Sequence, residues 1–253
     1  MEIEKCRLCG TQENISYEHV PPKSCYNRNV RYTKVPFLEY IQKDKLLDEK
    51  QKLKIEQGGV GFYSLCKKCN TDLGTNYVKA YSIFIKCMAK IAFKNDNNYF
   101  VVDIKELELL KILKQIVSMF LSINDYQFSR TFIELVDFVN SPESNDLPEK
   151  FRIFCYLNSE GSLRHLPLGV EGNFISNISI ACSEICFPPF GCVLTIDFNG
   201  KIDGLTEITN FKNCPLDKKS NLSLGIYKLP AISPFHLDYR GKEQIESERN
   251  EIS

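Results

Sequence analysis

Two Cys-x-x-Cys pairs, Cys6/Cys9 and Cys66/Cys69, constrain this 253-residue chain more than any other feature. Each pair can present two thiolates to one tetrahedral ion, and two such pairs are the usual ligand set of a structural zinc site. The alternatives are four unrelated core thiols or two redox-active pairs. The spacing favours one structural zinc ion, whose loss would unfold the module around it.

Composition favours a soluble globular protein, with 43% hydrophobic and 25% charged residues. No apolar run reaches membrane-spanning length, and the first five residues do not resemble a signal peptide. Eleven cysteines without such a signal are typical of a reducing compartment. We therefore expect a cytoplasmic protein with no membrane partner.

Charge is unevenly distributed along the chain, although its formal net charge is zero. Residues 1–94 carry 17 Lys and Arg against 10 Asp and Glu, whereas the remainder carries 15 against 22. A basic half beside an acidic half indicates nucleic-acid contact through the basic half. Lysine-rich loops alone would give the same pattern, so this alternative stays open.

Periodicity predicts an α+β fold, in which a zinc-stapled module precedes helices and an antiparallel sheet domain. Helical spacing covers 36–57, 77–93, 104–123 and 129–139. Strands are expected at 60–65, 151–157, 163–168, 175–187, 192–198, 201–205 and 222–229. We expect the strand at 151–157 to pair with that at 163–168, and Asn199-Gly200 to form a hairpin turn.

These elements suggest three parts. Residues 1–95 form the zinc-containing module, in which 27–57 is an insertion, and 96–240 form an α+β domain of unknown role. The polar segment 241–253 is expected to be a flexible tail.

An acidic-histidine pair, Glu18-His19, lies between the two cysteine pairs and is followed by Val20-Pro21-Pro22. On an extended segment these neighbouring side chains face opposite ways, so one can bind a metal while the other addresses a water molecule. Histidine can accept a proton from water near neutral pH. Asn70 directly follows the last cysteine of the second pair.

This order of residues resembles the four-cysteine type of the HNH, or ββα-metal, endonucleases. The resemblance covers about residues 1–80. It implies that Glu18 and Asn70 bind a catalytic Mg²⁺ or Mn²⁺, that His19 is the general base, and that the four cysteines hold a structural zinc.

Three features depart from that family. Glu18 stands where the family usually has Asp, and 46 residues separate His19 from Cys66, more than a minimal module needs. The middle Asn that usually braces the loop before the second strand is not evident, because Gln57-Gly58-Gly59 lie there.

The predicted function is therefore metal-dependent hydrolysis of nucleic-acid phosphodiesters, with DNA favoured over RNA by the resemblance alone. The alternative is a catalytically inactive zinc-containing module that binds nucleic acid or protein. A protein partner or a second copy could bind through the C-terminal domain. Outside the motif, His165 and His236 are expected on the surface or on strands, and Cys182, Cys186 and Cys192 as buried thiols.

Overall fold

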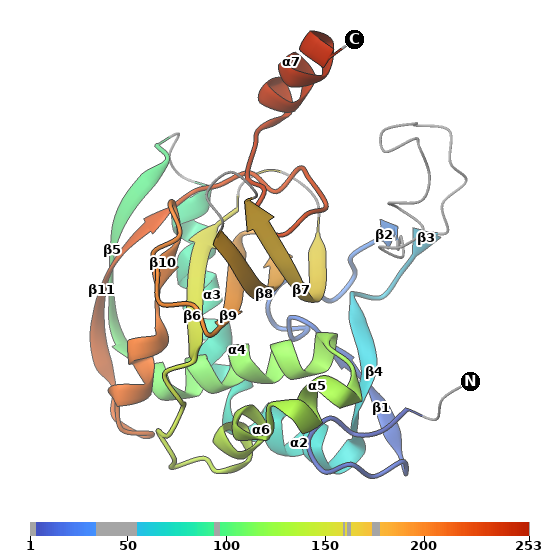
Figure 1. Cartoon of the computed structure of the whole chain (residues 1–253). Coiled ribbons are helices and arrows are strands. Elements are labelled where there is room, and N and C mark those ends of the chain that lie inside the picture. Colours follow the sequence, from blue (N-terminus) through green and yellow to red (C-terminus); the bar gives the residue numbers. More distant parts are fainter. Residues whose placement is uncertain are drawn as a thin grey trace.

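The computed structural model describes residues 4–33, 55–93, 97–158, 160, 163–173 and 178–252. Helices and antiparallel sheets are mixed along the chain, which confirms the α+β class (Figure 1). Among these residues no helix is long and apolar enough to cross a membrane. Most of the expected 36–57 helix lies outside the described residues.

The N-terminal part contains a two-stranded hairpin that runs directly into a helix. Its elements are β1 (Ile15–His19), β2 (Tyr32–Thr33), β3 (Ile55–Glu56), β4 (Gly61–Cys66), α2 (Lys67–Asn76) and α3 (Val78–Ala92). β1 pairs antiparallel with β4, and β2 with β3. The strand and helix predicted at 60–65 and 77–93 are thus confirmed, whereas the end of the 36–57 pattern is a strand.

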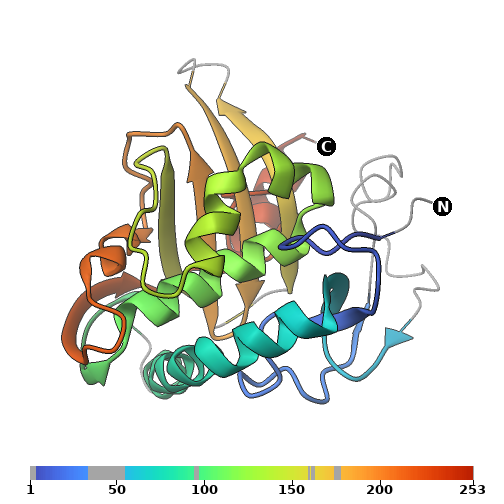
Figure 2. The same ribbon diagram turned by 90° about the horizontal axis from the view of Figure 1, so that it is seen from below.

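Almost every side chain of helix α4 (Leu109–Ile123) is buried, as expected for a helix at the centre of the fold. It contacts β7 and β8 of the main sheet on one side and packs beside α3 and α6 (Figures 1 and 2). Lys114 lies within this apolar surface, and burial lowers its pKa to about 8. Its ammonium donates to the carbonyls of Phe138 and Ser141, at the end of α6 (Ile133–Asn140).

The main sheet of the described chain has the order β10-β6-β9-β8-β7, all antiparallel. Its strands are β6 (Phe151–Leu157), β7 (Arg164–Asn173), β8 (Ile178–Phe187), β9 (Phe190–Ile196) and β10 (Thr206–Glu207). The predicted pairing of 151–157 with 163–168 is wrong, because β9 lies between β6 and β8. Every residue of β9 is buried, in keeping with its inner position between β6 and β8.

Three further predictions of local structure are wrong. Asn199-Gly200 does not form a two-stranded hairpin, since the next strand, β10, pairs with β6 instead of β9. Tyr99–Leu107 is strand β5, with alternate residues buried, and it pairs with β11 (Ser220–Tyr227); the expected helix therefore begins only at Leu109. The helix predicted at 129–139 is broken at Phe132 into α5 (Tyr126–Thr131) and α6.

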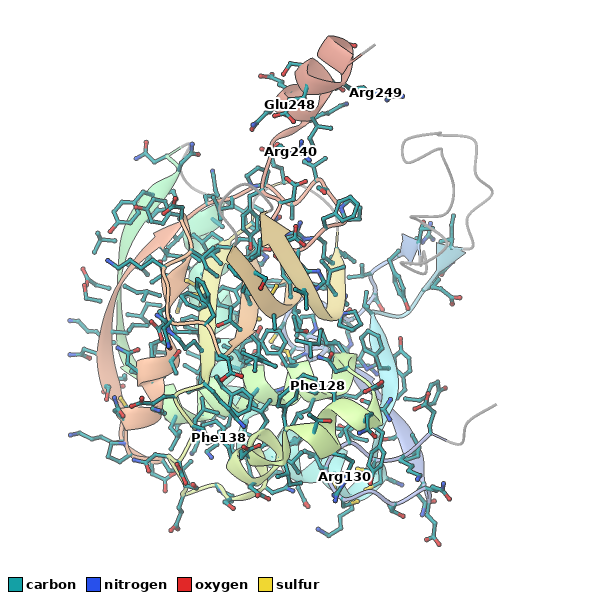
Figure 3. The ribbon with its side chains drawn as sticks, viewed as in Figure 1. Phe128, Arg130, Phe138, Arg240, Glu248 and Arg249 are labelled. Atoms are coloured by element: carbon teal, nitrogen blue, oxygen red, sulfur yellow. The ribbon has the colours of Figure 1, made fainter. Side chains whose placement is uncertain are left out.

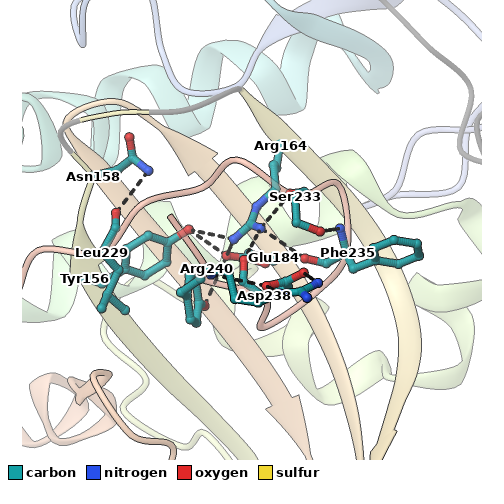
Figure 4. A network of polar contacts seen from close by, with 10 residues as sticks. Tyr156, Asn158, Arg164, Glu184, Leu229, Ser233, Phe235, Asp238 and Arg240 are labelled. Carbon is teal, nitrogen blue, oxygen red and sulfur yellow. Dashed lines mark hydrogen bonds and ion pairs between the residues drawn. The ribbon is translucent and has the colours of Figure 1, made fainter. Parts of the chain in front are cut away.

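A buried ion pair anchors the segment that follows β11 to the main sheet (Figure 4). Arg164 Nη2 lies 2.5 Å from Glu184 Oε1, and both side chains are at most 2% exposed. Arg164 also donates to the backbone carbonyls of Ser233, Phe235 and Asp238. These bonds compensate the burial of the guanidinium and hold the loop in place.

The C-terminal segment forms a helix, α7 (Lys242–Ile252), where the sequence predicts a flexible tail. It extends away from the body of the protein (Figure 1). Arg240 pairs with Asp238 and with Glu248 of α7, near the base of the helix (Figure 3). Cys182, Cys186 and Cys192 are buried free thiols as predicted. His165 lies on strand β7, but His236 is 8% exposed and lies in a turn, contrary to prediction.

Candidate functional site

The four motif cysteines come together at the base of the β1–β4 hairpin. The sulfur atoms of Cys6, Cys9, Cys66 and Cys69 all lie within 4.8 Å of one another, and the Cys9 and Cys66 sulfurs are 3.7 Å apart. A tetrahedral zinc with Zn–S bonds of about 2.3 Å places its sulfurs about 3.8 Å apart. The cluster could therefore hold a metal ion such as zinc.

Local backbone structure presents these sulfurs. Gly10, with a φ of 75°, donates its N–H to the Cys6 carbonyl, which closes the first knuckle. Cys66 is the N-cap of α2, and its sulfur accepts from the Cys69 amide at 3.5 Å. The second pair thus straddles a strand-to-helix turn, and the first pair is tied to β4 through the Arg7 amide and the Ser64 carbonyl.

The electrostatics of the cluster favour a cation. Burial raises the pKa of the Cys9 and Cys69 thiols. Burial alone would also raise that of Cys6, but backbone hydrogen bonds lower it below its ordinary value. One thiolate is thus stabilised while its neighbours resist ionisation, and a bound divalent cation would offset the repulsion among four thiolates.

Glu18 and His19 lie at the other end of β1 and face opposite sides of the hairpin. The rings of Tyr17 and His19 are 5.0 Å apart, which places these two side chains on one face and Glu18 on the other. Glu18 is 9% exposed, and burial raises the pKa of its carboxyl to about 7. The opposed orientation expected from the sequence is present.

His19 is oriented by a backbone carbonyl. Its Nε2 lies 3.1 Å from the carbonyl oxygen of Gly58. Since a carbonyl only accepts, Nε2 carries the proton and Nδ1 is the basic nitrogen. Burial lowers the pKa of His19, so the neutral, proton-accepting form prevails at neutral pH.

Asn70 reaches the Glu18 face of the hairpin from the first turns of α2. Its Nδ2 donates to Ser16 Oγ at 3.1 Å. Ser16 and Glu18 alternate with Tyr17 on β1, so they share a face. Within the described chain, no hydrogen bond occupies Asn70 Oδ1, so this oxygen is available as a ligand.

Asn27 is a site residue that the sequence does not reveal. It is fully buried, and its Nδ2 donates to the carbonyls of Pro21 and Val60, at 2.6 and 2.8 Å. Its Oδ1 accepts from the Val60 amide at 2.7 Å. These bonds brace the loop before β4. The HNH resemblance implies an Asn in this bracing role near Gly58, where the sequence has none. The position is hidden because its main partner is 33 residues away.

A cleft of about 990 Å³ lies beside the hairpin and is lined by residues of both of its strands. Tyr17 and Tyr63 from β1 and β4 form one wall, with Tyr32 from β2 beside them. The opposite wall comes from the C-terminal end of α4, from α5 and from the start of β7. The cleft therefore adjoins the hairpin that carries His19.

No family model, curated protein or solved structure matches this chain in the comparisons with known proteins.

Proposed function

We propose that the protein is a metal-dependent HNH-type endonuclease that hydrolyses nucleic-acid phosphodiester bonds. One observation carries the proposal: β1 and β4 form an antiparallel hairpin that continues into α2, with Glu18 and His19 on its first strand and Asn70 on its helix. This is the ββα arrangement that the resemblance implies. The bracing Asn, which the sequence lacks near Gly58, is supplied spatially by Asn27.

The donor set on one face of the hairpin suits a hard divalent cation. The Glu18 carboxylate and Asn70 Oδ1 are oxygen ligands of the kind that Mg²⁺ and Mn²⁺ prefer. When bound there, the ion supplies charge stabilisation to the phosphate oxygens and the departing 3′ oxygen. Ionising Glu18 is opposed by its burial, and the ion itself favours the charged form.

His19 would act as the general base. Its Nε2–H is held by the Gly58 carbonyl, so Nδ1 can take the proton from the attacking water. The lowered pKa keeps the imidazole neutral before the reaction. After proton transfer both ring nitrogens carry a proton, and the Gly58 carbonyl, which keeps its bond from Nε2–H, would stabilise the imidazolium.

The four-cysteine cluster would contribute structurally. A zinc bound by Cys6, Cys9, Cys66 and Cys69 would join the N-terminal knuckle to the junction of β4 and α2. The hairpin face that Asn70 shares with Ser16 depends on this junction.

Nucleic acid is the proposed partner, and DNA is favoured over RNA on the resemblance alone. The excess of basic residues in 1–94 supports contact through the N-terminal part. We expect lysines of the 43–54 insertion and of the Cys66 knuckle to carry this contact, and those of the insertion lie outside the described residues. Lys67 and Lys68 on α2 are described and exposed, although Lys68 also pairs with Asp72 at 3.0 Å.

Glu18 also supports a second candidate function. A carboxyl that is 9% exposed, with a pKa raised to about 7, is a poor ligand unless the ion compensates its desolvation. If it does not, the protein would be a catalytically inactive zinc-containing module that binds nucleic acid or protein.

Cleavage of plasmid DNA with added Mg²⁺ or Mn²⁺ distinguishes the two candidates. His19→Gln keeps a donor for the Gly58 carbonyl but removes the base, so the rate should fall at least about a hundredfold with zinc content unchanged. His236→Gln is the matched control, because His236 also bonds a backbone carbonyl, that of Pro167 at 2.9 Å, and lies outside the hairpin. Equal cleavage by His19→Gln and wild type would refute the base assignment, and no cleavage by wild type would favour the inactive module.

A further inference from the structure

The cleft beside the hairpin has an aromatic wall. The rings of Tyr17 and Tyr63 are 5.3 Å apart at an interplanar angle of 71°, and Tyr17 OH lies 3.5 Å from Tyr32 OH. Tyr17 is fixed further by donating to the Gly59 carbonyl at 3.1 Å. Tyr63 is 60% exposed, although the last three residues of its strand are buried.

Burial of apolar surface within the protein does not account for the exposed Tyr63 ring. A planar ring held at the mouth of a cleft can stack on a flat ligand. Its partner Tyr17 also contacts the His19 ring, so the aromatic wall and the proposed base belong to one continuous face. A nucleotide whose phosphate lies at His19 would direct its base toward this wall.

Charge limits what can enter the cleft. The charged residues that line it are Glu4, Arg7, Glu56 and Asp125, which is one cation against three carboxyls. Arg7 is already bonded to Glu4 at 2.9 Å and to the Asn124 carbonyl at 3.0 Å. A phosphate group would meet net negative charge there.

We propose that this cleft receives one unpaired nucleobase of the substrate strand, stacked on Tyr63 beside Tyr17, while its phosphate stays outside at the hairpin tip. The inference rests on the proposed nuclease function and specifies its substrate class: nucleic acid with an unpaired nucleotide next to the scissile bond.

Binding measured without cleavage tests this proposal. The protein carries His19→Gln, no Mg²⁺ is added, and the probes are a labelled duplex with one unpaired adenine and the fully paired duplex of the same sequence. The unpaired adenine should increase affinity, and Tyr63→Ala should remove about 5- to 150-fold of the affinity for that probe, the range for loss of one base–aromatic stack. Affinity for the paired duplex should change little.

Three controls make the result specific. Tyr63→Phe should retain the preference, because the stacking face remains. Tyr99→Ala removes another half-exposed tyrosine, 48% exposed on β5 and not part of the cleft, and should have no effect. An unpaired thymine in place of adenine should also bind more tightly than the paired duplex, because stacking on an aromatic ring tolerates every base.

Equal affinity for the two duplexes, absence of binding to either, or equal losses from Tyr63→Ala and Tyr99→Ala would overturn the proposal. The outcome is separable from the nuclease test. A Tyr63-dependent preference in a protein that never cleaves supports the cleft and rejects the nuclease. Cleavage by wild type without that preference supports the nuclease and rejects the cleft proposal.

Discussion

Replacement of Asn27 by Ala should destabilise the protein by about 3–4 kcal/mol. The side chain makes three hydrogen bonds in a fully buried position, to the carbonyls of Pro21 and Val60 and from the Val60 amide. Each neutral bond contributes about 1 kcal/mol net. The Val60 carbonyl keeps a second donor, the Val20 amide at 3.0 Å, but the Val60 amide would be left buried without a partner, which costs about 1 kcal/mol or more.

Urea unfolding of the zinc-saturated protein, followed by circular dichroism, measures this loss. Asn221→Ala is a suitable control, because Asn221 is exposed and only accepts one long bond, from the Glu106 amide at 3.3 Å. It should change the free energy of unfolding by less than about 0.5 kcal/mol. Asn27→Asp keeps the acceptor for Val60 N–H but loses both donors and buries a carboxyl, so it should also be strongly destabilising.

An Asn27→Ala variant as stable as wild type within about 0.5 kcal/mol would refute the reasoning. That result would mean that water, or a rearranged loop, satisfies the Val60 amide at no cost. The bracing role assigned to Asn27 would then fall, and with it one support for the proposed hairpin site.

Two further outcomes follow from the cysteine cluster and from His165. Protein purified without added metal should contain one zinc per chain by elemental analysis, and Cys69→Ser should lose it and become sensitive to protease; zinc-free, well-folded wild type would contradict this. His165 Nε2 lies 2.8 Å from the Val20 carbonyl oxygen, and burial lowers the pKa of His165 to about 4. In the unfolded chain the same imidazole has a pKa of about 6.5, so below that pH the unfolded chain binds a proton that the folded protein does not yet bind. The contribution of neutral His165 to the free energy of unfolding is therefore complete above pH 6.5 and is lost as pH falls through 4, by at most about 3 kcal/mol. His165→Gln should flatten this part of the curve of stability against pH.

Local patterns in the sequence predict much of the N-terminal part. The spacing within each Cys-x-x-Cys pair is a local property, and the four sulfurs do come together. Alternation along five residues of β1 correctly places Glu18 opposite His19. Helix α3 likewise follows from its own apolar spacing.

Long-range pairing accounts for most of the errors. Ile104 and Leu107 fit a helical period, but they lie on β5, whose partner β11 is more than a hundred residues further along the chain. β6 likewise pairs with β9 and β10, which lie far from it in the sequence, so no local turn signal indicates these pairings. Asn27 was missed for the same reason, because an isolated Asn in a loop carries no sign of the strand that it will brace.

The hairpin needs a constraint at each end because β1 has only five residues and pairs with a single strand. A two-stranded hairpin of this kind is at best marginally stable alone. At the base, where Ile15 lies opposite Cys66, a metal ion held by the four cysteines would tie the segment before β1 to the junction of β4 and α2. At the tip, where His19 lies opposite Gly61, Asn27 joins the two strand extensions through Val60.

Glu18 and His19 lie between these two constraints, and each constraint positions a different part of the proposed site. The base holds Asn70 to the Glu18 face, whereas the tip holds the carbonyl that orients His19. If the proposed nuclease function holds, damage at the base should therefore act first on affinity for the catalytic divalent ion, and damage at the tip on proton transfer to His19.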